Sequence, residues 1–207
     1  MYYFIFFNYI WCTTKNKKLQ KNYYSINTFQ KAINDISLAG AEIVEVKLGN
    51  FDLNDLRHTA FLLIETECAE FLSVSLRKHS KAYSKNLKSM LKYSRKFSKK
   101  QLIDSREKLD RVKSAIINLF QNIDFLASPT APQIPFLHSE PTPINQAEIT
   151  ALANISGIPA ISLPYGLTAA GLPLSLQVMA PPYREAELIN IAEDLEEIWG
   201  RLTLPIS

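Results

Sequence analysis

The chain has 207 residues, 47% of them hydrophobic and 21% charged, which is an ordinary composition for one soluble globular domain. A formal net charge of +3 is too small to indicate a nucleic-acid partner by itself. The two cysteines, Cys12 and Cys68, stand far apart in the sequence. They exclude a disulfide framework and a paired-cysteine metal site, and they favour a reducing, cytoplasmic location.

Residues 1–12 are almost wholly apolar and aromatic. A membrane-spanning helix needs about 20 such residues, so the segment predicts no transmembrane span. Its lysines follow the apolar run, whereas a secretory signal carries its basic residues before it. We predict that residues 1–27 form an accessory extension, first apolar and then basic. A segment that contacts a membrane is the alternative.

The next predicted elements are a helix, a strand and a long helix. Thr28 is a candidate N-cap for a helix that ends at Gly40, and residues 41–47 alternate like a strand. Asp52 then caps a long helix with one apolar face. Its carboxylates lack a histidine at helical ligand spacing, so we predict neither a metal site nor a cofactor. They are Glu65, Glu67 and Glu70.

The strongest charge feature is the segment Arg77–Lys100, which holds ten Lys or Arg residues and no acidic one. Four lysines recur at helical steps and predict a basic stripe: Lys81, Lys85, Lys88 and Lys92. Aromatic residues at Tyr83, Tyr93 and Phe97 interleave with them. A solvated helix face explains such a run, and weak contact with RNA or an anionic membrane surface is the alternative.

Two more elements lead to a proline-rich connection. Asp104 begins a predicted amphipathic helix, which is followed by a short buried strand at residues 123–127. Residues 128–143 contain five prolines, so they predict an extended loop.

The last third predicts a helix, two strands and a final helix. Asn145 is available to cap a helix over residues 147–155, and Gly157 stops it. Apolar runs at 160–164 and 172–179 are joined by a short turn, which predicts antiparallel strands. Residues 184–199 have the apolar spacing of a surface helix that packs on the sheet.

Residues 154–166 (Asn-Ile-Ser-Gly-Ile-Pro-Ala-Ile-Ser-Leu-Pro-Tyr-Gly) and 171–177 (Gly-Leu-Pro-Leu-Ser-Leu-Gln) resemble the C-terminal part of the amidase signature family. Asp124 and Ser128-Pro129-Thr130 resemble the strand that precedes this part. The resemblance covers residues 28–207. It implies an α/β fold, a mixed sheet flanked by helices, as the C-terminal half of an amidase-signature domain. It also implies that the loop at 128–143 borders the substrate pocket, with Thr130 as the substrate-binding candidate.

The catalytic half of the family pattern has no counterpart here. Family members use a serine nucleophile, a second serine in a cis peptide, a lysine base and a Gly-Ser-rich oxyanion loop. This chain has six glycines and no Gly-Gly, Gly-Ser-Ser-Gly or Gly-x-Ser-x-Gly sequence. We interpret Ser156, beside Gly157, as structural. The three histidines, His58, His79 and His138, sit in no nucleophile motif, so we predict no catalytic residue.

We therefore expect an amidase-type hydrolase fragment, similar to the A subunit of an amidotransferase, that is inactive alone. One alternative is a non-catalytic module that binds RNA or protein through residues 77–100. Another is one half of a split amidase, in which a second chain supplies the catalytic half and a small amide binds only after complementation. Because half of a sheet leaves an open edge, we also expect poor solubility or self-association.

Overall fold

The structure, a computed structural model, describes residues 3–7, 23–46 and 51–202. Its centre is a mixed sheet of five strands in the order β2-β1-β3-β5-β4. The strands are β1 (Tyr3–Phe7), β2 (Glu42–Val46), β3 (Phe125–Pro129), β4 (Ala160–Leu167) and β5 (Pro173–Met179). Strand β1 is parallel to β2 and β3, whereas β5 is antiparallel to both of its neighbours. The predicted α/β class and the antiparallel β4–β5 pair are confirmed.

Strand β1 is the main difference from the sequence-based prediction. The sequence predicts an accessory extension that includes residues 3–7, yet these residues lie inside the sheet, where Phe4 pairs with Ile43 on one side and Phe125 on the other. A short, continuous apolar run has no alternation that marks it as a strand, which is why the sequence pattern did not reveal it. Residues 1–2 and 8–22 of the predicted extension lie outside the described residues.

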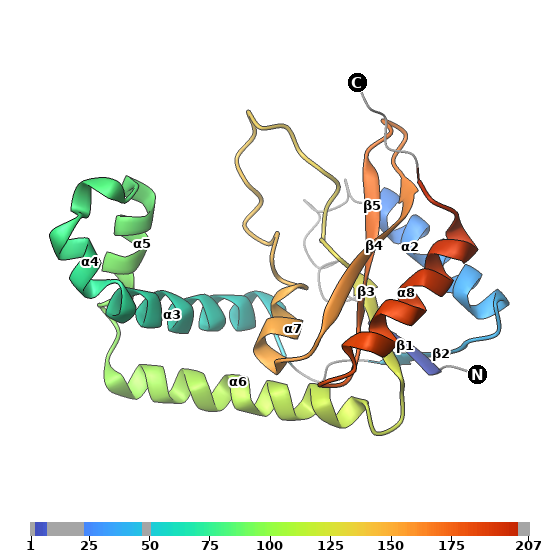
Figure 1. The fold of residues 1–207 in the computed structure, drawn as a ribbon, viewed down its shortest axis with the longest axis horizontal. Coiled ribbons are helices and arrows are strands. Elements are labelled where there is room, and N and C mark those ends of the chain that lie inside the picture. The colour runs from blue at the N-terminus through green and yellow to red at the C-terminus, as the bar shows by residue number, and fades with distance from the viewer. Residues whose placement is uncertain (1–2, 8–22, 47–50, 203–207) are drawn as a thin grey trace.

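Helices cover both faces of the sheet (Figure 1). Helices α2 (Tyr23–Leu38) and α8 (Glu185–Trp199) bury one core against β3, β4 and β5. The second core joins the other face to α7 (Ala151–Ser156) and to the sheet-proximal ends of α3 (Leu53–Phe71) and α6 (Lys99–Leu119). Strand β3 serves both cores because successive side chains point to opposite faces: Phe125 and Ala127 enter the first, and Leu126 the second.

Helices α3 and α6 also extend away from the sheet and form an arm (Figure 1). Its distal end consists of α4 (Ser73–Lys78), a 3-10 turn η2 (Ser80–Ala82) and α5 (Lys85–Ser94). The predicted cap Asp52 is confirmed, since its side chain accepts a hydrogen bond from the Asp55 amide at 3.0 Å. The basic run is divided among these short helices and the start of α6, so its charges do not follow one straight stripe.

Three helix starts differ from the predicted ones. Helix α2 begins at Tyr23 before the predicted cap Thr28. Helix α6 begins at Lys99 and not at Asp104, because Ser98 and Gln101 form a capping box. Helix α7 begins at Ala151, and residues between Asn145 and Thr150 form turns instead. In each case the apolar pattern located the helix but not its first residue.

Glycines explain two tight features of the fold. Gly157 ends α7 in the left-handed conformation, with φ of +65°, where a residue with a Cβ would be strained. At Gly166 a Cβ would lie 3.1 Å from the Thr28 side chain, so this glycine lets β4 approach α2 closely. Among the described residues, no helix is long and apolar enough to cross a bilayer.

Candidate substrate pocket

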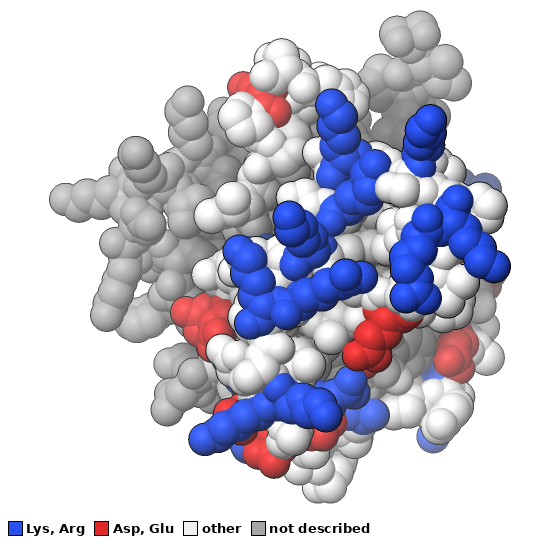
Figure 2. Space-filling model, turned by 90° about the vertical axis from the view of Figure 1, so that its left-hand side faces the viewer, with Lys and Arg blue, Asp and Glu red and all other residues white. Residues whose placement is uncertain are grey.

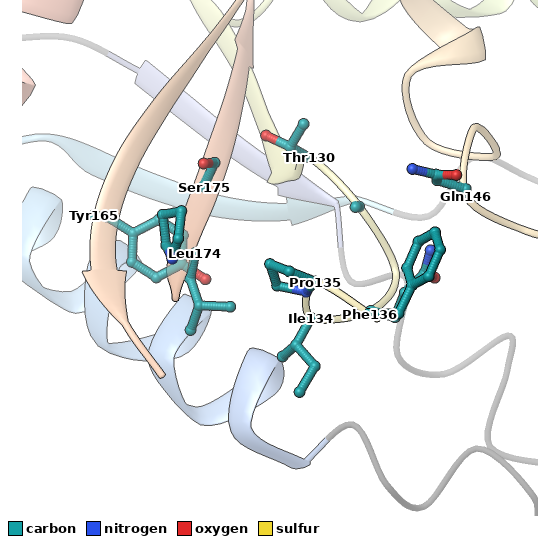
Figure 3. Close-up of a pocket in the computed structure, with 11 residues that line it drawn as sticks. Thr130, Ile134, Pro135, Phe136, Gln146, Tyr165, Leu174 and Ser175 are labelled. Carbon is teal, nitrogen blue, oxygen red and sulfur yellow. The ribbon is translucent and has the colours of Figure 1, made fainter. Parts of the chain in front are cut away.

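A pocket of about 320 Å³ opens where β3 ends and the proline-rich loop begins (Figure 3). Its walls come from the loop, from the β4–β5 pair and from Gln146. The lining residues are Thr130, Ala131, Gln133, Ile134, Pro135, Phe136, Gln146, Tyr165, Pro173, Leu174 and Ser175. None of these side chains is a carboxylate, lysine, arginine or histidine. The pocket therefore combines an apolar wall with neutral hydrogen-bonding groups, an arrangement typical of small-molecule sites.

Thr130 holds the loop to the sheet at the pocket wall. Its backbone amide donates to the Ser175 carbonyl at 3.0 Å, which extends the β3–β5 ladder beyond Pro129. Its hydroxyl lies 2.7 Å from the Ser162 hydroxyl on β4. The structure thus places Thr130 in the lining, as the sequence predicted. That Thr130 binds substrate stays a prediction.

Tyr165 is the strongly perturbed titratable group of this wall. Burial removes water from the phenol and raises its pKa from 10.0 to about 12, so the hydroxyl keeps its proton at neutral pH. The ring lies 5.9 Å from the Trp199 ring, centroid to centroid, which ties β4 to the end of α8. A neutral phenol can donate a hydrogen bond to a carbonyl oxygen but cannot act as a base.

Gln133, a lining residue, carries a hydrogen-bond acceptor without a partner among the described residues. Its Oε1 atom is buried and has no hydrogen-bond partner within the described part of the chain. A buried acceptor without a partner is costly unless a ligand or water satisfies it. The lining hydroxyls of Thr130, Tyr165 and Ser175 can donate a hydrogen bond to a carbonyl oxygen, and the lining amides can donate or accept one.

Sequence reasoning found Thr130 but missed Gln133, Tyr165, Leu174 and Ser175. The strand residues are brought to the pocket by the β4–β5 pairing, in which Pro164 lies opposite Ser175 and a bulge falls before Gly166. This bulge re-aims the side chains of β4, and the neighbouring Pro and Gly were its only sequence signal.

Two polar residues that carry the family resemblance are buried inside the sheet. Ser128 and Gln177 are 0% and 4% exposed, and the Gln177 amide donates to the Ser128 hydroxyl at 3.4 Å and contacts the Met179 sulfur at 3.5 Å. They bond β3 to β5 and do not line the pocket. Their role in this structure is to satisfy polar groups in the core.

Ser156 agrees with its structural interpretation. It is 1% exposed on α7, and its hydroxyl has no hydrogen-bond partner among the described residues. A nucleophilic serine needs a base within hydrogen-bond reach and access to substrate. Ser156 has neither in this arrangement.

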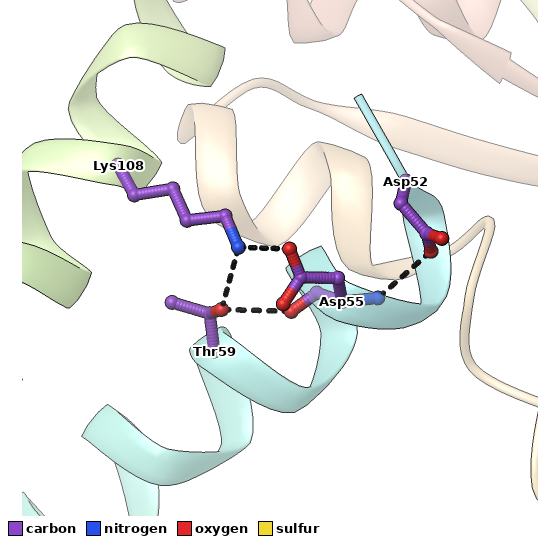
Figure 4. Close-up of polar contacts among 4 residues, drawn as sticks. All are labelled: Asp52, Asp55, Thr59 and Lys108. Carbon is purple, nitrogen blue, oxygen red and sulfur yellow. Dashed lines mark hydrogen bonds and ion pairs between the residues drawn. The ribbon is translucent and has the colours of Figure 1, made fainter. Parts of the chain in front are cut away.

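A lysine lies beside a threonine at the base of the arm, and its contacts mark it as structural (Figure 4). The Lys108 ammonium forms an ion pair with Asp55 and lies 3.4 Å from the Thr59 hydroxyl. That hydroxyl donates to the Asp55 carbonyl at 2.7 Å. Because the ammonium is paired and none of these residues lines the pocket, the cluster fastens α6 to α3.

Two glutamates of α3 lie in different surroundings. Glu67 forms an ion pair with Arg106 at 2.8 Å, and burial raises the pKa of Glu65 above its usual value. His58 lies 2.9 Å from the Arg57 guanidinium. Within the described ranges, no group of three His, Cys, Asp or Glu side chains could hold a metal ion.

Comparison with protein families and sequences gives consistent results. A family model described as Amidase matches residues 24–189. The A subunit of a glutamyl-tRNA(Gln) amidotransferase from Wolbachia sp. subsp. Drosophila simulans is 39% identical over 101 residues, which are 46% of this chain and 20% of that protein. The corresponding protein of Methanobrevibacter smithii is 29% identical over 181 residues, or 77% of this chain and 38% of that protein.

Solved structures share the fold. An amidase crystal structure superposes with a TM-score of 0.77 at 18% identity and covers 96% of this chain. An allophanate hydrolase of Kluyveromyces lactis superposes with a TM-score of 0.76 at 19% identity and also covers 96% of this chain. The chain spans 46% of the first structure and 32% of the second. Its length thus corresponds to less than half of each enzyme.

Proposed function

The chain belongs to the amidase family, and on this premise we propose that it is the C-terminal half of an amide hydrolase that does not cleave amides by itself. The observation that carries the proposal is the pocket, which offers neutral donors and acceptors suited to a carboxamide but no nucleophile with a base. Hydrolysis requires a nucleophile that adds to the carbonyl carbon, a base that takes its proton, and donors for the oxyanion.

The composition of the pocket supports the inactive state. Thr130 and Ser175 are the hydroxyls in the lining besides Tyr165, and no lysine or histidine lines the pocket with them. An unactivated hydroxyl is a weak nucleophile at neutral pH. The full sequence also lacks the glycine-serine loop whose backbone amides would approach an oxyanion.

A second chain that supplies the catalytic half would make this chain one part of a split amidase. The chain superposes on 46% and 32% of the two solved enzymes, and its pocket lining holds no lysine or histidine that could act as the base. In such a complex we assign this chain the wall of the substrate pocket, with Thr130 positioned against a small amide. We place this function in the cytoplasm, where a free thiol such as Cys68 is stable.

A serine-directed fluorophosphonate probe tests the inactive state. We expect no stoichiometric labelling of the purified chain and no hydrolysis of simple amides above the uncatalysed rate. An active serine amidase treated in parallel controls for probe reactivity, and heat-denatured chain controls for non-specific labelling. Labelling of a single serine that disappears when this serine is replaced would overturn the proposal.

A second candidate function is a non-catalytic module that binds RNA or protein. The observation that favours it is the unpaired positive charge at the distal end of the arm. This surface lies on α4, η2, α5, the turn after α5 and the start of α6, and none of its residues lines the pocket. RNA binding would therefore be compatible with the pocket and independent of amide chemistry.

A further inference from the structure

The distal end of the arm carries ten cationic side chains between Glu70 and Asp104, with no acidic residue among them. We call this surface the basic tip: Arg77, Lys78, Lys81, Lys85, Lys88, Lys92, Arg95, Lys96, Lys99 and Lys100. All are exposed except Lys88, which is partly buried. Figure 2 shows Lys and Arg side chains gathered over this end of the molecule.

These charges are not neutralised within the described part of the chain. The arm's described ion pairs, Arg106 with Glu67 and Lys108 with Asp55, join α3 to the middle of α6, outside the basic tip. In the basic tip, Lys88 donates to the Ser80 carbonyl at 3.1 Å, which leaves its charge uncompensated. A dense patch of one sign repels itself and attracts a polyanion from solution. The partner that fits is therefore a chain of phosphates.

The packing of α5 favours a nucleic acid over a membrane. Leu91 of α5 is 3% exposed, and α5 packs against α3, so its main apolar side is already covered. A helix that lies in a membrane interface instead presents a continuous apolar face next to its cations. On α5 only two apolar side chains, Met90 and Tyr93, are exposed, and they do not make such a continuous face.

Tyr93 supplies a second element of nucleic-acid recognition. The Tyr93 side chain is exposed. Its ring meets the Phe97 ring edge-on, with 5.5 Å between the ring centroids, and the Lys96 ammonium lies 5.3 Å from the Tyr93 centroid. Phe97 braces the ring, and the lysine ammonium sits over the ring in a cation–π contact. Proteins that bind single strands combine a basic track for the backbone with aromatic rings on which unpaired bases stack.

We infer that the basic tip binds single-stranded RNA, with lysines of α5 on the phosphates and an unpaired base stacked on Tyr93. The inference rests on the second candidate function, the binding module. A base in a duplex is already stacked between its neighbours, so Tyr93 cannot reach its face. Single strands should therefore bind more tightly than duplexes of equal length.

The test is fluorescence anisotropy with the full chain and a labelled oligouridylate of about 20 nucleotides, from about 50 mM to about 200 mM salt. The triple variant Lys85→Gln/Lys88→Gln/Lys92→Gln should weaken binding at least tenfold at the lower salt. It should also reduce the slope of log K against log salt by about 2, because each lost phosphate contact in a single strand contributes about 0.7. Tyr93→Ala should weaken binding about five- to a hundredfold with an unchanged slope, and Tyr93→Phe should retain binding.

A matched control removes three exposed charges elsewhere: Lys31→Gln/Arg111→Gln/Lys113→Gln. It should change the affinity less than twofold, and circular dichroism should show equal helix content in all variants. Equal losses in the two triple variants would overturn the assignment of the site. Tighter binding of the duplex, or no effect of Tyr93→Ala, would overturn the single-strand mode while leaving an RNA-binding module. If the chain binds anionic vesicles but no RNA, both the single-strand mode and the RNA-binding module are overturned. None of these outcomes bears on the proposed amide function.

Discussion

Tyr165 is the residue whose burial has the clearest measurable consequence. Its pKa is raised to about 12 in the folded chain from an ordinary value of 10.0. Between these values the unfolded chain loses the phenol proton while the folded chain keeps it, so the folded state binds more protons. The free energy of unfolding therefore falls as the pH rises from about 10 towards 12, and the contribution is fully present below pH 10.

We expect the substitution Tyr165→Phe to remove this part of the alkaline destabilisation. Urea denaturation at about pH 8 and about pH 10.5 should show a smaller loss of unfolding free energy in the variant than in the parent chain. Tyr183→Phe is the matched control, because Tyr183 is 93% exposed. An equal alkaline loss in the parent chain and in Tyr165→Phe would show that the buried phenol does not control this transition.

Among the residues that line the pocket, the sequence predicted Thr130 and did not predict its neighbours. Thr130 could be predicted because it follows a buried strand within the resemblance to the amidase family. Tyr165 and Gln133 could not, because their proximity depends on how a bulged strand and a proline-rich loop fold over each other. Such placement is a tertiary property, and no local pattern encodes it.

The helix α6 illustrates how a few polar residues define an element. Its apolar periodicity predicted the helix, and Val112 and Ile116 are indeed fully buried in the core. Its first turn has no such periodicity, so the sequence pattern predicts a start at Asp104. Ser98 and Gln101 extend it by bonding each other's backbone amides, a short-range device that a hydrophobic pattern does not report.

The capping box gives a prediction for the stability of the arm. Ser98→Ala removes the side-chain acceptor of the Gln101 amide and should lower the free energy of unfolding by about 1 kcal/mol in urea denaturation. Ser114→Ala on the same helix is the control, because Ser114 only donates to the Asp110 carbonyl one turn earlier. Its effect should be close to zero. Comparable losses in both variants would show that the cap contributes nothing specific.

Association between copies of the chain depends on apolar surface that is exposed in the structure. The arm exposes Phe61, Ile64 and Phe71 along α3, and Phe71 is 86% exposed. Helix positions separated by three and seven residues lie on one side, so these side chains form a stripe. Strands β2 and β4 are the sheet edges within the described structure. Apolar stripes and open edges promote association between chains.

We therefore expect the purified chain to self-associate. Light scattering coupled to size-exclusion chromatography should give a mass above the 23.5 kDa of one chain, increasing with concentration. Ile64→Lys/Phe71→Lys should shift the mass towards the monomer, whereas Tyr183→Lys, which alters an exposed aromatic outside the arm, should not. A parent chain that is monomeric at all concentrations and melts in one sharp transition would show that the chain closes its own core.

The position of β1 has a consequence for the order of events during folding. Of the three strands β1, β2 and β3, strand β1 leaves the ribosome first, and β2 with its connecting helix α2 follows soon after. The other neighbour, β3, begins only at Phe125, long after β2 has ended at Val46. The two sides of the sheet can therefore join only through a contact between residues far apart in sequence, and such non-local pairing slows folding. During that interval one edge of β1 remains without its neighbour, and an unpaired strand edge makes a folding chain prone to aggregation.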